Sequence, residues 1–163
     1  MKEVKLYIDM IPRSSWYTNA RSILSGHEWN KIKRKVYAIN NNRCSICNGI
    51  GKKHPVEAHE RWKYNEDTKV QKMINIVPLC PMCHLTTHYG LAQIKGKEQQ
   101  AYEHFLKVNN FEEYEAEHYM EIGYKTWIRL SKIEWKVDVS YLIENYEDDL
   151  TDITKERILD IQK

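Results

Sequence analysis

Four cysteines form two C-x2-C pairs, Cys44 with Cys47 and Cys80 with Cys83, and they account for every cysteine in the 163-residue chain. Each pair can offer two thiolates to one tetrahedral ion, at Zn–S distances of about 2.3 Å. The alternative is a set of buried or redox-active thiols, but redox C-x-x-C motifs do not usually occur as two matching pairs around a hairpin. The spacing therefore predicts one structural zinc ion held by all four cysteines.

Three histidines lie within or directly after the cysteine pairs and are candidates for chemistry. His84 and His88 are four residues apart in a stretch predicted to be helical, so their imidazoles share one face, one turn apart. Such a pair suits a divalent metal, and His59 precedes it between the two cysteine pairs. Alternatively, one of His84 and His88 donates a hydrogen bond to a cysteine thiolate.

These residues resemble the HNH (ββα-metal, His-Me finger) endonuclease family. The resemblance rests on His59 on a first strand, on Asn75 in an N-[IL]-x-x-L-C run, and on a C-x2-C-H-x3-H helix, and it is tight over residues 44–90. A V-E-x-H-E-x-W-x-Y motif, with I-P-R-S-S-W at residues 11–16 and N-A-R at residues 19–21, is similar to a bacterial and phage subfamily. This longer pattern extends the likeness to the N-terminus.

The resemblance implies a metal-dependent endonuclease that hydrolyses phosphodiester bonds in DNA. His59 would be the general base, and Asn75 would orient its ring through a hydrogen bond across the hairpin. His84 and His88 would hold a catalytic divalent ion, such as Mg2+ or Mn2+, while the zinc on the cysteines would stay structural.

Position 58 departs from the family, which usually carries Asp or His there as a metal ligand, whereas this chain has Ala58. Either Glu57 or Glu60 substitutes for that ligand, or His59 is itself the ligand and Glu60 is the general base. A third alternative is a catalytically degenerate zinc module that binds nucleic acid or a host or phage protein partner.

The elements that must position these residues follow from the hydrophobic pattern. Ser25-x-x-Glu28 has the form of a capping box and predicts a helix over residues 27–40. Strands are expected at residues 55–64 and 70–79, followed by a helix that starts with Pro81 and ends near residue 89, where Gly90 closes it. This order of strand, strand and helix is the ββα unit.

Beyond residue 96 the pattern predicts helices over 97–108 and 111–132, a short strand around residues 135–139 and a last helix ending near residue 161. The expected fold class is α+β. A zinc-stapled core with an N-terminal basic helix occupies residues 1–96, and an acidic, mainly helical extension that packs on it occupies residues 97–163. The stretch 144–163 holds few apolar residues and is expected to be removable without exposing a core.

Charge is divided unevenly along the chain. Residues 1–97 hold 17 Lys and Arg against 7 Asp and Glu, whereas residues 98–163 hold 8 against 16. A basic half that carries the metal site is expected of a phosphate-binding face. The alternative is that these charges are only solvated. The basic side chains expected to contact DNA phosphates are Lys31, Lys33, Arg34, Lys35, Lys52, Lys53, Arg61 and Lys63.

Two classes of protein are excluded on composition. Apolar runs fall far short of the roughly 20 residues that a membrane-spanning helix needs. Acidic residues near the N-terminus argue against a secretory signal, so a cytoplasmic, reducing location is expected, which also disfavours disulfides.

Overall fold

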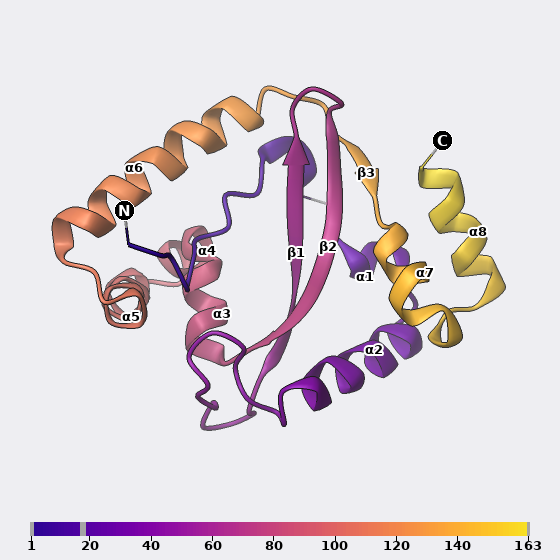
Figure 1. Ribbon diagram of the computed structural model, residues 1–163, viewed down its shortest axis with the longest axis horizontal. Helices are drawn as coiled ribbons and strands as arrows, with labels where there is room; N and C mark the ends of the chain where they lie inside the picture. Colours follow the sequence, from indigo (N-terminus) through magenta and orange to yellow (C-terminus); the bar gives the residue numbers. More distant parts are fainter. Residues whose placement is uncertain (1, 17–18, 163) are drawn as a thin grey trace.

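The computed structural model describes residues 2–16 and 19–162, which form a mixed α+β fold around a long β-hairpin (Figure 1). The helices and strands are η1 (Arg13–Ser15), α1 (Ala20–Ile23), α2 (Gly26–Ile39), β1 (Glu57–Asn65), β2 (Val70–Leu79), α3 (Pro81–Thr87), α4 (Tyr89–Ile94), α5 (Glu98–Asn109), α6 (Glu113–Leu130), β3 (Lys136–Asp138), α7 (Ser140–Tyr146), η2 (Glu147–Asp149) and α8 (Asp152–Ile161). In this part of the chain, no helix combines the length and the apolar character needed to cross a bilayer.

The predicted hairpin is confirmed, with β1 starting at Glu57 rather than at residue 55. β1 pairs antiparallel with β2, and the tight turn is closed by Asn65, whose Oδ1 accepts hydrogen bonds from the backbone N of Asp67 and Thr68 at 3.0 and 3.1 Å. The short strand β3 joins the other edge of β2 in parallel. The sheet order β1-β2-β3 leaves β1 as an edge strand.

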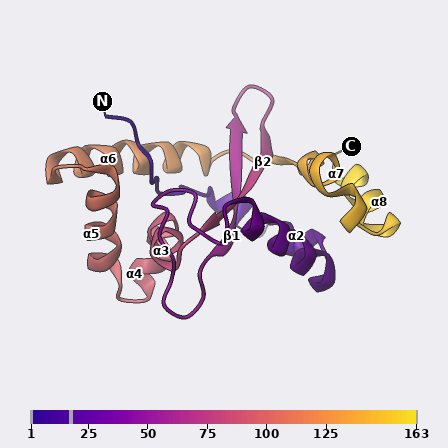
Figure 2. The ribbon, with the colours of Figure 1, turned by 60° about the horizontal axis from the view of Figure 1, so that its bottom comes forward.

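The hairpin separates two apolar clusters, because successive strand residues point to opposite faces. One face contributes Ala58, Met73 and Ile76 to a core shared with α2, α7 and α8. The other contributes Val77 and Leu79 to a core shared with the N-terminal segment, α5 and α6. Figure 2 shows the two groups of helices on either side of the strands. The extension 97–163 therefore packs on both faces.

The helix predicted from the capping box is confirmed as α2. Ser25 Oγ accepts from the backbone N of Glu28 at 3.3 Å, and the Glu28 carboxylate accepts from the backbone N of Ser25 at 2.7 Å. Trp29, Ile32 and Val36 recur at helical spacing and are buried.

The single helix predicted over residues 80–89 is two helices in the structure. His88 leaves the helical conformation, with φ −90° and ψ 55°, so α3 ends at Thr87 and α4 begins at Tyr89. The sequence had suggested that Gly90 ends a helix, but Gly90 lies inside α4. The break between the two helices therefore lies at His88, the last of the candidate site residues.

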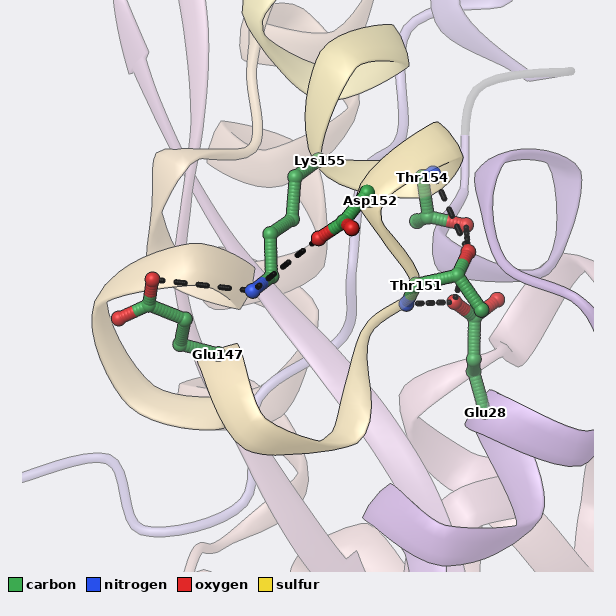
Figure 3. Close-up of polar contacts among 6 residues, drawn as sticks. All are labelled: Glu28, Glu147, Thr151, Asp152, Thr154 and Lys155. Carbon is green, nitrogen blue, oxygen red and sulfur yellow. Dashed lines mark hydrogen bonds and ion pairs between the residues drawn. The ribbon is translucent and has the colours of Figure 1, made fainter.

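The prediction that residues 144–163 are removable is wrong. Tyr146, Leu150 and Ile158 are buried in the core that covers Ala58. The buried Glu28 carboxylate accepts from Thr151 N at 2.8 Å and from Thr151 Oγ1 at 3.1 Å, and Thr151 in turn caps α8 (Figure 3). The apolar residues of this stretch are few, and Ile153 and Leu159 are exposed, but the three that are buried complete the core on this side of the hairpin.

Candidate metal centres

The four cysteines meet at one end of the hairpin. Cys44 and Cys47 lie in the turn that precedes β1, Cys80 is the N-cap of α3, and Cys83 lies in its first turn. The four sulfur atoms lie within 4.8 Å of one another, and the Sγ atoms of Cys47 and Cys80 are 3.6 Å apart. A tetrahedral zinc ion with Zn–S bonds of about 2.3 Å requires sulfur separations of about 3.8 Å. The geometry fits a four-cysteine metal site.

Backbone donors prepare these sulfurs for negative charge. The N–H of Gly49 points to the Cys47 sulfur, and that of Cys83 to the Cys80 sulfur, both at 3.4 Å. Gly51 allows the turn to approach α3, because a Cβ there would lie 2.6 Å from the Pro81 ring. Hydrogen bonds from Cys80 and Cys83 lower the pKa of Cys44, and the same hydrogen bonds, together with burial and the charge of Cys44, raise the pKa of the other two. Four thiolates at this spacing therefore require a cation.

The cysteine cluster has a histidine neighbour that the sequence did not indicate. His104 of α5 has its Nε2 at 3.2 Å from the Cys83 sulfur. The sequence left open that His84 or His88 makes such a contact, but both of these histidines belong to a different cluster. His104 lies 21 residues beyond Cys83, and only the packing of α5 against α3 brings them together.

The second cluster contains His59 of β1, His84 of α3 and His88 at the end of α3. Their ring centroids are 4.7 to 5.4 Å apart, and one nitrogen from each lies within 4.8 Å of the others. His59 is 2% exposed, whereas the other two are partly exposed. Three imidazoles arranged in this way can bind one divalent transition metal.

Two carboxylates orient the histidine rings. Asp9 accepts from His59 Nε2 at 2.6 Å, and Glu57 pairs with His84 Nδ1. The second oxygen of Glu57 meets Nε2 of the exposed His54 at 2.5 Å. Within the described part of the chain, His59 Nδ1 is buried and has no hydrogen-bond partner. A histidine that binds a metal with one nitrogen commonly donates its other N–H to a carboxylate, which is the arrangement seen here.

The environment favours neutral imidazoles at His84 and His88. Burial lowers the pKa of His84 and His88, and the neighbouring His59 adds to the effect, which brings the pKa of His88 to about 4. Neutral imidazole is the form that binds metals, so near pH 7 no proton has to leave His88 before a metal can bind.

Asn75 and Glu60 lie away from the histidine cluster. Asn75 Oδ1 accepts from Tyr141 Oη of α7 at 3.0 Å, next to a break in register between Arg61 and Trp62. The hydrogen bond expected from Asn75 to His59 is made by Asp9 instead. Glu60 accepts from the backbone N of Ala20 at 3.0 Å. As the neighbour of His59 on a strand, Glu60 faces the opposite side of the sheet and cannot be its partner base.

One of the eight predicted phosphate contacts is buried, and a second is exposed but paired with an acidic side chain. Arg61 is 8% exposed, and its guanidinium stacks over the Tyr7 ring at 3.7 Å, so it is not part of the basic surface. Lys35 forms an ion pair with Asp149. The remaining six are fully or partly exposed, namely Lys31, Lys33, Arg34, Lys52, Lys53 and Lys63.

Comparisons with protein-family models, with curated proteins and with solved structures find no match to this chain. The geometry of the two clusters is therefore what the functional proposal rests on.

Proposed function

We propose that this protein is a metal-dependent endonuclease that hydrolyses phosphodiester bonds in DNA, with a catalytic metal on His59, His84 and His88. The observation that carries the proposal is the three-histidine cluster, with its rings oriented by Asp9 and Glu57, beside a separate four-cysteine cluster. Four protein ligands complete a tetrahedral site, as in structural metal centres, whereas three leave one position for water or substrate, as in catalytic centres.

The roles of the side chains follow from their hydrogen bonds. His59 serves as a metal ligand through Nδ1 rather than as the general base, because its Nε2 is engaged by Asp9 and its ring is buried. Asp9 and Glu57 hold the rings of His59 and His84 in the orientation that a metal requires. The metal, when bound, would lower the pKa of a coordinated water and stabilise the charge that develops on the scissile phosphate.

Ala58 does not argue against this activity. It faces the core formed with α2, α7 and α8, so an acidic or histidine side chain at that position would point away from the three histidines. The non-catalytic alternative rests on Ala58 and on the acidic C-terminal third of the chain, and Ala58 no longer favours it.

The metal preference follows from the ligands. Three imidazoles favour Zn2+ or Ni2+, whereas Mg2+ prefers carboxylate and water oxygens. We expect nicking of supercoiled DNA with Zn2+ or Ni2+, and little with Mg2+ alone.

The decisive comparison uses His88→Ala and His118→Ala. His118 is exposed on α6 and belongs to neither cluster, so it provides a matched control. His88→Ala should lower the nicking rate by roughly 100-fold or more while the cysteine site keeps its zinc. Equal rates for the two variants would mean that the histidine cluster does not carry the reaction.

A further inference from the structure

Among the described residues, His104 is the side chain from outside the cysteine loop and α3 that makes a hydrogen-bond contact with the four-cysteine site. Four thiolates on one divalent ion leave a net charge of about −2 in a site where Cys44, Cys80 and Cys83 are at most 5% exposed. Buried charge is costly unless hydrogen-bond donors satisfy it. Backbone N–H groups point to the sulfurs of Cys47 and Cys80, and others lower the pKa of Cys44.

The contact at Cys83 is different, because a side chain makes it. His104 Nε2 lies 3.2 Å from the Cys83 sulfur, and Cys83 is fully buried. His104 of α5 thus gives the Cys83 sulfur a hydrogen-bond donor, as nearby backbone N–H groups do for the sulfurs of Cys47 and Cys80.

The packing of α5 restricts the orientation of the His104 ring. Ala101, His104 and Phe105 share one helix face, and Ala101 and Phe105 are fully buried. Thr86 of α3 donates its hydroxyl to the carbonyl of Ala101 at 3.3 Å and to that of Met82 at 2.8 Å. The two helices are therefore held in register at the level of the cysteine site.

We propose that His104 is a positioning residue of the four-cysteine site, which donates its Nε2–H to the Cys83 thiolate and so slows the release of the metal and ties α5 to the zinc core. This role does not depend on the proposed nuclease activity, because it concerns the structural site alone.

The first test uses Co2+ in place of zinc. Thiolate ligands give a sulfur-to-cobalt charge-transfer band and imidazole ligands do not, so the band reports on the cysteine site alone. The variants are His104→Leu, which cannot donate, and His104→Gln, which can. The control is His118→Leu on α6, which lies in neither cluster.

In His104→Leu we expect Co2+ to leave the cysteine site 10- to 100-fold faster in excess chelator, as is typical when a metal ligand is deprived of its hydrogen bond. The charge-transfer band should also move to lower energy, because the sulfur lone pairs are no longer stabilised. His104→Gln should stay close to the wild type in both respects. A wild-type rate and band for His104→Leu, or equal changes for Leu and Gln, would overturn the proposal.

A second measurement needs no variant and applies even if His104→Leu fails to fold. In the zinc-loaded wild type, the ring 15N shifts of His104 should report a proton on Nε2, and the 113Cd-loaded protein should show a coupling between that proton and the metal. A proton on Nδ1 only, or the absence of the coupling, would contradict the hydrogen bond.

Discussion

The carboxylate of Asp9 engages Nε2 of His59, so Nδ1, which is buried and has no hydrogen-bond partner among the described residues, is the nitrogen that we expect to bind a metal. The backbone of Asp9 is fixed as well, since its N–H donates to the carbonyl of Thr87 at 2.9 Å. The residue therefore connects the N-terminal segment, β1 and α3 at one point.

Replacing Asp9 with Asn should weaken the histidine site and leave the cysteine site intact. The amide is a poorer acceptor and can present its NH2 to His59, so the ring no longer has a fixed tautomer. We expect the affinity of the histidine site for Zn2+ to fall about 10- to 100-fold. Calorimetric titration with Zn2+ measures it, starting from protein in which zinc fills the cysteine site alone. Asp67→Asn in the exposed hairpin turn is the control, and an equal affinity in both variants would refute the role of Asp9.

The buried carboxylate of Glu28 links two helix N-termini. Burial opposes its ionisation, but hydrogen bonds from Thr151 and Ser25 outweigh burial and lower its pKa to about 2, against an ordinary value of 4.5. Because the folded pKa is the lower one, Glu28 stabilises the fold fully above about pH 4.5 and loses this effect as the pH falls toward 2.

Glu28→Gln should therefore be destabilised by about 3 kcal/mol at pH 7, with the difference from the wild type shrinking between pH 4.5 and pH 2. Urea denaturation across this pH range measures the difference. A gap that stays constant from pH 7 to pH 2 would show that the charge of Glu28 is not what stabilises the contact.

At the scale of elements, the sequence predicted local features well and distant contacts poorly. The capping box, the hairpin turn and the cysteine pairs each depend on residues a few positions apart, so their spacing is visible in the chain. The contact of Asp9 with His59, that of His104 with Cys83, and that of Thr151 with Glu28 span 50, 21 and 123 positions. Such contacts arise only when packed helices and strands bring remote segments together.

The C-terminal stretch, which contains α7, η2 and α8, is where the structure differs most from the sequence prediction. Deleting residues 144–163 should unfold the core on the α2 face, because it exposes Leu142 and removes Leu150 and Ile158 from that cluster. We expect a protein that lacks a cooperative thermal transition, measured by near-UV circular dichroism. As a control, deleting residues 162–163 alone should leave the transition unchanged. A truncated 1–143 protein with a native melting temperature would contradict the packing described here.

At the scale of the whole molecule, the hairpin has the histidine cluster on one face, the cysteine cluster at one end, and helices on both faces. Cys80→Ser or Cys83→Ser should prevent folding rather than reduce activity alone, since the zinc free energy contributes to the stability of the fold. Zinc content and melting temperature measure the effect. A variant that keeps both at wild-type values would show that the four-cysteine site is wrongly assigned.

The exposed basic residues near the hairpin should give DNA binding a steep salt dependence. Changing Lys52, Lys53 and Lys63 to Gln should weaken binding at low salt and reduce the slope of log K against log salt by up to about 0.9 for each phosphate that is no longer neutralised. Fluorescence anisotropy with labelled duplex DNA measures the slope. The control variant changes three exposed lysines of the acidic extension to Gln, namely Lys125, Lys132 and Lys136. Equal slopes in both variants would refute a DNA-binding role for the first set.

The central claim is that one chain binds two metals at two chemically different clusters. Elemental analysis of purified protein, after equilibration with Zn2+ and removal of excess, counts them directly. We expect two ions per chain in the wild type, and one in the double variant His84→Ala/His88→Ala with an unchanged fold. One ion per chain in the wild type, or two ions retained in the double variant, would contradict the claim.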